Sequence, residues 1–204
     1  MKKVNELIKL PEVKTIFNLF NDNQGIYLVG GCIRDTLSGK EVTDIDFAID
    51  IDPEEVVKTL SNNNIKFYDI GINYGTVTAV IDSKNYEITS LREDIETDGR
   101  HAKVKYTSDR KADSLRRDFT INAIYANRDG ELFDFHNGID DIENRNLKFI
   151  GSANDRVKED YLRILRYFRF YADFSNFEID ANLKKVLKKR SKNCSKITKE
   201  IILP

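Results

Sequence analysis

The hydrophobic pattern of this chain changes once, close to Gly151, and that change limits the folds it can adopt. Before Gly151, short apolar runs with the character of β-strands alternate with helical stretches. These runs lie at residues 26–29, 43–49, 76–81, 86–91 and 132–135. After Asp155 the apolar residues keep a helical spacing. We therefore expect an α+β domain over residues 1–150, followed by an all-α domain over residues 151–204.

The charge of the chain changes at the same place. Residues 1–150 carry 20 lysines and arginines against 27 aspartates and glutamates, a balance of −7. Residues 151–204 carry 13 against 7, a balance of +6. The acidic part is suited to metal ions and the basic part to phosphates. A lysine-rich helical end that is simply solvated would give the same counts, so charge alone leaves both interpretations open.

Composition is that of a folded, intracellular protein. Hydrophobic residues make up 40% of the chain and charged residues 33%, which excludes disordered and fibrous classes. Cys32 and Cys194 lie far apart and lack the spacing of metal ligands, as expected in a reducing compartment. The first residues lack the apolar core of a signal peptide, and no apolar run is long enough to span a bilayer. We expect a cytoplasmic protein, whose oligomeric state the sequence does not constrain.

Local signals predict several elements of the first domain. A helix interrupted by Pro11 is expected up to Phe20, and Asp52 with Pro53 and the following acids is typical of a helix start. A hairpin turn at residues 82–85 joins two predicted strands. Residues 93–108 are polar and predict a mobile loop, and residues 114–125 predict a helix.

Asp44 and Asp46 form the first candidate site. The strand period over residues 43–49 puts both carboxylates on one face and the apolar residues on the other. Like charges on one strand face repel, and a bridging divalent cation would relieve the repulsion. Oxygen ligands favour Mg²⁺, which takes one or two protein carboxylates and completes its shell from phosphates and water. Two incidental acids on a solvent-facing strand are the alternative, since this short pattern is common.

Gly30 and Gly31 form the second candidate site, between a strand and a helix. Without a Cβ atom, this backbone can approach a phosphate closely, and the N–H groups of the helix start can point at it. Arg34, one turn later, can bind the same oxygens. An ordinary strand-to-helix turn would use the same glycines, and Asp35 is expected to pair with Arg34 or stabilise the helix.

Two arginine-rich segments follow. In the first, residues 113–123, the Arg–Asp pairs could be surface pairs, but Asn122 between apolar residues needs a buried partner. In the second, residues 159–170, Asp160 and three arginines recur every three residues on one ridge of a largely buried helix. Buried arginines need anions, either protein carboxylates or nucleotide groups, and an Asp beside an Arg could read a base edge.

Four motifs, in order, resemble a known family: the class II tRNA nucleotidyltransferases (CCA-adding enzymes) and bacterial poly(A) polymerases. The resemblance spans Leu28 to Phe170. Its motifs are Leu-Val-Gly-Gly-Cys-Ile-Arg-Asp with Asp44-Ile45-Asp46, then Arg-Arg-Asp-Phe-Thr-Ile-Asn-Ala, then Asp134 to Asp141 with Gly138, and finally Glu-Asp-Tyr-Leu-Arg-Ile-Leu-Arg-Tyr-Phe-Arg-Phe. The family implies a polymerase-β-like head, a small mixed sheet flanked by helices, and a helical neck that selects the nucleotide.

The resemblance also implies roles for the matching residues. Asp44 and Asp46 would bind Mg²⁺ in two-metal catalysis, and Glu87 is our candidate for a third carboxylate, with an ordinary hairpin acid as the alternative. The expected nucleotide-binding residues, which hold the triphosphate or select CTP or ATP, are Gly30, Gly31, Arg34, Arg117, Asp160, Arg163, Arg166 and Arg169. The RNA partner would be the 3′ end of tRNA. His101 is interpreted as a residue of the family's flexible loop and His136 as structural.

The choice among family members rests on weaker signals. Poly(A) polymerases tend to carry a basic pair after the first helix, and residues 71–76 have none, which favours CCA addition or the addition of only CC or only A. A truncated RNA-binding module without activity is the third hypothesis. Family members are considerably longer than this chain, so we expect either a fragment or a reduced protein, with weak tRNA binding in both cases.

Overall fold

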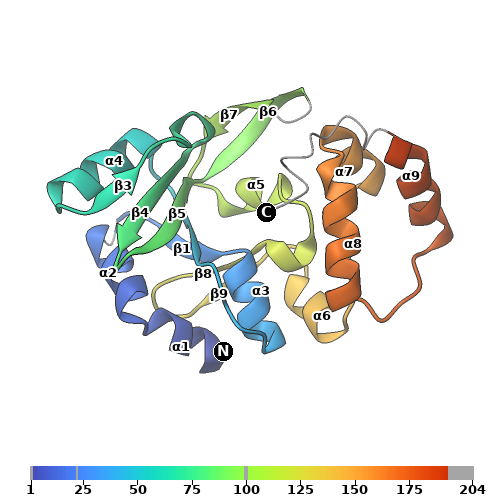
Figure 1. Cartoon of the computed structure of the whole chain (residues 1–204), viewed down its shortest axis with the longest axis horizontal. Helices are drawn as coiled ribbons and strands as arrows, with labels where there is room; N and C mark the ends of the chain where they lie inside the picture. The colour runs from blue at the N-terminus through green and yellow to red at the C-terminus, as the bar shows by residue number, and fades with distance from the viewer. Residues whose placement is uncertain (1, 22, 99–100, 193–204) are drawn as a thin grey trace.

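A mixed sheet of seven strands forms the centre of the molecule, in the order β3-β4-β5-β2-β1-β8-β9 (Figure 1). The structure is a computed structural model that describes residues 2–21, 23–98 and 101–192. The strands are β1 (Ile26–Val29), β2 (Asp46–Ile49), β3 (Lys66–Tyr68), β4 (Thr76–Ile81), β5 (Lys84–Ser90), β8 (Ile124–Ala126) and β9 (Leu132–Asp134). Strands β2 and β5 are parallel, and the other neighbours are antiparallel.

The helices of the first 62 residues lie where the local signals predict them. They are α1 (Lys2–Ile8), α2 (Pro11–Leu19), α3 (Gly31–Ser38) and α4 (Pro53–Asn62). Asp52 occupies the N-cap position of α4, but no capping hydrogen bond of its side chain is found in the described structure. The hairpin between β4 and β5 is tighter than expected, because Asp82 and Ser83 both adopt positive φ, as a two-residue turn requires.

Apolar side chains cover both faces of the sheet. On one face, Phe47 and Ile49 of β2 lie in the main core, where Phe17 of α2 packs edge-on against Phe47 at 5.5 Å. On the other face, Ala48 is buried with a second cluster that includes Leu91 and Tyr125. The prediction of a half-buried strand over residues 43–49 is therefore wrong. The strand is shorter, both faces are covered, and Asp44 lies before its first residue.

The polar segment at residues 93–108 is a β-hairpin and not the predicted loop. It forms β6 (Arg92–Asp98) and β7 (His101–Tyr106), with an irregularity in pairing at Ile95. The two strands of a hairpin form backbone hydrogen bonds with each other and need no apolar face for this pairing. The hydrophobic periodicity of the sequence therefore does not indicate the hairpin. His101 therefore belongs to a strand.

The predicted helix over residues 114–125 is also wrong. A shorter helix, α5 (Arg110–Leu115), starts at Asp109, whose side chain accepts from the backbone N of Lys111. A 3₁₀ turn, η2 (Thr120–Asn122), follows, and the chain then enters β8. Phe119, Thr120 and Ile121 disfavour helix at this point, because aromatic and β-branched side chains lose rotamer freedom there. The turn places Asn122 against the cavity described below.

Between Gly151 and Lys192, three helices stand beside the sheet: α7 (Ala153–Glu159), α8 (Leu162–Phe174) and α9 (Ala181–Ser191) (Figure 1). Helix α6 (Gly138–Glu143) precedes them. Phe149 stacks on Tyr167 of α8 at 5.5 Å, and Phe119 packs edge-on against Phe170 at 5.6 Å. A single core cluster runs across Gly151, so the division of the chain at this residue stays a prediction. No helix in the described ranges has both the length and the apolar character needed to cross a membrane.

Candidate active site

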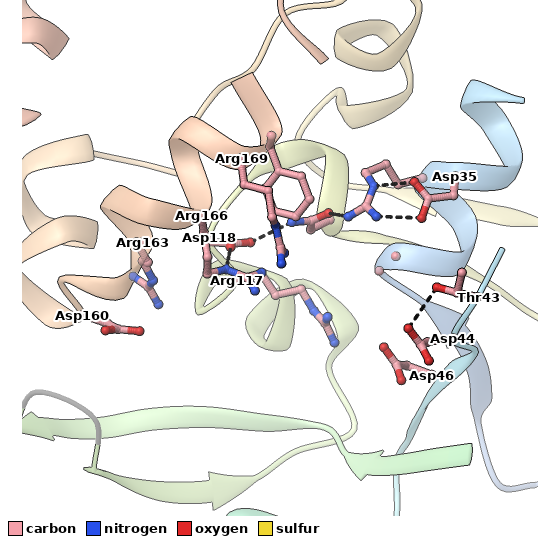
Figure 2. Close-up of a pocket in the computed structure, with 15 residues that line it drawn as sticks. Asp35, Thr43, Asp44, Asp46, Arg117, Asp118, Asp160, Arg163, Arg166 and Arg169 are labelled. Atoms are coloured by element: carbon pink, nitrogen blue, oxygen red, sulfur yellow. Dashed lines mark hydrogen bonds and ion pairs between the residues drawn. The ribbon is translucent and has the colours of Figure 1, made fainter. Parts of the chain in front are cut away.

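One cavity of about 430 Å³ brings together ten of the eleven residues that the sequence predicts for the site. It lies between α3, the start of β2 and helix α8, the helix of the predicted neck (Figure 2). Its lining residues are Gly30, Gly31, Arg34, Asp35, Thr43, Asp44, Asp46, Arg117, Asp118, Asn122, Asp160, Arg163, Arg166, Arg169 and Phe170. Glu87 is the predicted residue outside the lining. In Figure 2, Asp44 and Asp46 lie on one side and the neck arginines on the other.

The glycine turn closes one end of the cavity. Gly30 has a φ of +76°, a value that residues with a side chain rarely adopt. Its backbone N donates to the carbonyl of Ile124 in β8, the neighbouring strand of the sheet. A Cβ atom at Gly30 would lie 3.7 Å from Nη1 of Arg117. The turn thus starts α3 and leaves space beside the guanidinium group of Arg117.

Asp46 stands at the start of β2, and Glu87 is its register partner on β5. Burial, together with the nearby carboxylates of Glu87 and Asp44, raises the pKa of Asp46 to about 6, against the opposing effect of Arg117. The parallel pairing of β2 and β5 therefore brings Glu87 close enough to Asp46 to affect its ionisation, although the Glu87 side chain is exposed.

The carboxylates fit a hard divalent cation. Among the described residues, no group of three or more His, Cys, Asp and Glu side chains forms a complete metal site. Mg²⁺ does not need one, because it takes one or two carboxylates and completes its shell from phosphates and water. Burial is the main cause of the raised pKa of Asp46, and the repulsion from Glu87 and Asp44 that adds to it is one that a bound cation would relieve.

Asp113, which the sequence analysis did not assign to the site, anchors Arg117. Its fully buried carboxylate accepts from Nη2 of Arg117 at 3.1 Å, from Nε of Arg116 at 2.8 Å and from the hydroxyl of Tyr125 at 2.6 Å. Burial alone would raise the pKa of Asp113, but Arg117 and Arg116 together hold it well below its usual range. The Arg–Asp pairs of this segment are therefore buried structural pairs and not surface pairs.

Arg34 is held from two sides within the cavity. Its guanidinium group pairs with both oxygens of Asp35, at 2.9 and 2.7 Å, as expected for Asp35. Its Nη1 donates to Oδ1 of Asn122 at 2.7 Å, and Asn122 is 6% exposed, which confirms that this asparagine has a buried partner. The group also lies over the ring of Phe170 at 4.7 Å.

Asp118 connects this network to the neck. Its carboxylate accepts from Nδ2 of Asn122 at 3.1 Å and from Nε of Arg166 at 2.6 Å. Burial opposes ionisation, yet Arg166 and Asn122 lower the pKa of Asp118. Asp118 was not among the site residues expected from the sequence. An acid directly after Arg117 in an otherwise apolar stretch is a usable signal, because a buried carboxylate requires cationic or N–H partners.

The neck side of the cavity departs from the predicted single helix. Helix α7 ends at Glu159 and α8 begins at Leu162, so Asp160 lies in an extended break, where its side chain accepts from the backbone N of Leu162. Only Arg163, Arg166 and Arg169 share the ridge of α8. Helical periodicity continues across the break, which hides it from the sequence.

The three neck arginines have different surroundings. Arg163 pairs with Glu159 at 2.7 Å and donates to the backbone carbonyl of Arg116 at 3.1 Å. Arg169 is exposed, and no hydrogen bond or ion pair of its side chain is found within the described ranges. Burial and the nearby cations Arg166 and Arg34 lower the pKa of Arg169, so positive charge is concentrated here. This end of the cavity is suited to an anion.

His136 stands outside the cavity. Its Nε2 lies 2.8 Å from the hydroxyl of Ser114, and burial lowers its pKa. This contact agrees with a structural role.

The fold matches part of the fold of CCA-adding enzymes. The crystal structure of the Bacillus stearothermophilus CCA-adding enzyme in complex with CTP superposes with a TM-score of 0.78 and 28% identity, over 93% of this chain and 46% of that one. The sequence model of the poly A polymerase head domain matches residues 26–148. The chain belongs to this family of nucleotidyltransferase head domains.

Curated relatives carry the same family resemblance. The mitochondrial CCA tRNA nucleotidyltransferase 1 of Danio rerio is 46% identical over 155 residues, which are 75% of this chain and 36% of the relative. The CCA-adding enzyme of Lactobacillus delbrueckii subsp. bulgaricus is 38% identical over 178 residues, 86% of this chain and 44% of the relative. The chain thus spans less than half the length of these relatives.

Proposed function

We propose that the chain transfers CMP and AMP from CTP and ATP to the 3′ end of tRNA, in CCA addition or repair. The observation that carries the proposal is the single cavity in which carboxylates, a glycine turn and arginines from two parts of the chain meet. Similar proteins are named CCA tRNA nucleotidyltransferase and CCA-adding enzyme, which supports the same chemistry here. We further propose a nucleotidyltransferase head at residues 1–150 and a nucleotide-selecting neck at residues 151–204.

We assign the carboxylates to Mg²⁺. Asp44 and Asp46 would hold it, with Glu87 as the third carboxylate, and their oxygen donors suit this cation. Bound Mg²⁺ lowers the pKa of a coordinated hydroxyl and stabilises the charge that develops on transferring phosphate. The preference of Asp46 for a proton at low pH makes cation binding, and hence activity, weaker below about pH 6.

The remaining residues bind and orient the nucleotide. The backbone N–H groups of Gly30 and Gly31, together with Arg34 and Arg117, would hold the triphosphate so that its α-phosphorus faces the RNA hydroxyl in line with the leaving pyrophosphate. Arg166 and Arg169 contribute positive charge from the neck. Asp113 and Asn122 fix Arg117 and Arg34, so little rearrangement is needed when the ligand arrives.

Base selection is assigned to Asp160 and Arg163. A carboxylate accepts and a guanidinium donates, so together they can match the hydrogen-bonding edge of cytosine or adenine. Glu159 and the carbonyl of Arg116 hold Arg163 from the side, which limits the positions that its remaining N–H groups can reach.

Two alternatives make different predictions. A poly(A) polymerase core would add long tails from ATP alone, and an inactive RNA-binding module would add nothing. The absence of a basic pair at residues 71–76 argues against the first, and the presence of Asp44 and Asp46 in the cavity argues against the second.

One assay separates these proposals. The protein is incubated with tRNA lacking its 3′ CCA, Mg²⁺, and radiolabelled CTP or ATP in separate reactions. Extension with CTP supports CCA or CC addition, and extension by a single A of tRNA ending in CC supports the AMP step. Long tails from ATP alone would indicate a poly(A) polymerase. The absence of product with either nucleotide would contradict the proposal. Omitting divalent metal, then restoring Mg²⁺, tests the metal assignment.

We propose a cytoplasmic location on the basis of cysteine usage. Cys32 is buried and unpaired, as a reducing compartment favours. Fractionation of cells expressing the tagged protein tests this, and recovery with mitochondria would contradict it.

A further inference from the structure

A line of hydrogen bonds joins two cavity arginines that come from opposite ends of the chain. Arg34 belongs to α3 and Arg166 to α8. Nη1 of Arg34 donates to Oδ1 of Asn122 at 2.7 Å, and Nδ2 of Asn122 donates to Oδ1 of Asp118 at 3.1 Å. The other oxygen of Asp118 accepts from Nε of Arg166 at 2.6 Å. Figure 2 shows Asp118 beside Arg166, and Asp35 at the far end of the line.

We propose that Asn122 is a positioning residue that fixes Arg34 and, through Asp118, Arg166 on the two sides of the nucleotide cavity. The inference rests on the proposed function, in which Arg34 holds the triphosphate and Arg166 contributes positive charge to the same cavity. Asn122 itself touches no reacting atom in this account. It acts by holding the head and neck arginines in register with each other.

The chemistry of asparagine suits this place. Arginine can only donate, and an ionised aspartate can only accept, so the residue between Arg34 and Asp118 must accept on one side and donate on the other. A side-chain amide does both, and its two neighbours fix which way it points. Aspartate at this position would lack the donor for Asp118, and leucine would lack both groups. Because Asn122 is buried, water does not readily replace either bond.

The contact also determines which part of Arg34 stays available. Asp35 takes Nε and Nη2, and Asn122 takes one hydrogen of Nη1. Three of the five N–H groups of the guanidinium group are thereby used within the protein. With Phe170 and Phe174 beside the group at 4.7 and 5.3 Å, its orientation is fixed before the ligand binds. Loss of Asn122 frees one end of the group and weakens this preorganisation.

Asn122→Leu tests the proposal because it removes both hydrogen bonds while keeping the branched shape of the side chain. Thr120→Val is the matched control: Thr120 is 5% exposed and lies in the same turn η2, but its hydroxyl donates to Asp141 at 2.8 Å, away from the cavity lining. We measure equilibrium binding of CTP and of ATP, KM and kcat for incorporation, and unfolding by urea. Asn122→Ala replaces the leucine variant if the latter does not fold.

We expect Asn122→Leu to weaken binding of both nucleotides and raise both KM values about tenfold, with a smaller change in kcat. Thr120→Val should bind both within about twofold of wild type, although it too loses a buried hydrogen bond. Wild-type binding by Asn122→Leu, or equal weakening in both variants, would overturn the role of Asn122. If the wild-type protein bound neither CTP nor ATP, this result would contradict the proposed function itself. The role inferred for Asn122 would then be contradicted as well, because it depends on that function.

Discussion

The ionised form of Asp46 suits the proposed metal binding but lowers the stability of the folded protein. It lies partly buried at the start of β2, with Glu87 in register and Asp44 close by, and its pKa is raised to about 6. In the unfolded chain the same carboxyl group has its ordinary pKa, near 3.8. The folded protein therefore binds the proton more tightly, so this residue favours folding below about pH 4, and that contribution is lost as pH rises towards 6.

Replacing Asp46 by asparagine should therefore separate stability from activity. Without divalent metal at pH 8, Asp46→Asn should be more stable than wild type by up to about 3 kcal/mol, because the repelled buried charge is gone. The same variant should lose nucleotide incorporation by at least about a hundredfold. Urea denaturation at pH 4 and pH 8 measures the first effect, which should shrink at the lower pH, and the tRNA extension assay measures the second. Retained incorporation would contradict the metal assignment.

At the scale of elements, the turn between β1 and α3 is the part of the site that the backbone itself determines. Gly30 has positive φ, whereas Gly31 begins α3 with ordinary helical geometry and only the end of Arg34 within 4 Å of a Cβ atom. The two glycines are adjacent in sequence but differ in what they require.

Substitution of these glycines provides a matched pair. Gly30→Ala should cost about 1–2 kcal/mol of stability through backbone strain and bring a methyl group towards Arg117, so nucleotide binding should weaken. Gly31→Ala should change stability by less than about 0.5 kcal/mol, since alanine suits a helix start without strain. Urea denaturation and nucleotide titration check both. Equal destabilisation by the two variants would show that positive φ is not the reason for Gly30.

The elements also show where sequence reasoning succeeds and where it fails. Strand β1, helices α3 and α4 and the hairpin of β4 and β5 were predictable, because turn residues and apolar periods agree there. The segment from α5 to β8 was not. Its fold depends on the buried charge of Asp113 and on the turn at Asn122, which join residues distant in sequence. The break at Asp160 also escaped prediction, because the helical period of apolar residues continues through it.

The sequence motifs predicted ten residues that the structure places in one cavity. The contacts between these residues could not be predicted from the sequence. That Arg34, Arg117 and Arg166 each depend on a neighbouring polar partner follows from distances alone. The position of Glu87 was predictable only in part. Its strand was predicted, but its place opposite Asp46 depends on the parallel pairing of β2 and β5.

At the scale of the whole molecule, the residues before and after Gly151 share one core. Phe119 is fully buried, and its ring lies 4.7 Å from Phe149, 5.6 Å from Phe170 and 6.1 Å from Tyr167. These rings join the segment after α5 to helix α8. The acidic and basic parts that the sequence separates by charge are therefore packed together through aromatic contacts.

We expect the two parts to unfold together. Phe119→Ala should destabilise the protein by about 3–5 kcal/mol, the usual cost of removing a buried aromatic ring. Because the shared core is contiguous, the loss should lower the midpoint of one transition, observed equally by far-UV circular dichroism and tyrosine fluorescence. Lys84→Ala is the control, since its exposed pair with Glu12 contributes less than about 1 kcal/mol. Two separate transitions would instead favour independent domains divided at Gly151.

The interruption between α7 and α8 has a consequence for how such a protein diversifies. Asp160 belongs to the connecting segment and Arg163 to the helix that follows, so their spacing depends on the angle at which one helix leaves the other. Substitutions along the packing surface of α8 can change that angle without altering either side chain. Under the proposed role of Asp160 and Arg163 in base selection, remote changes in helix packing would alter the nucleotide preference while both motif residues stay the same.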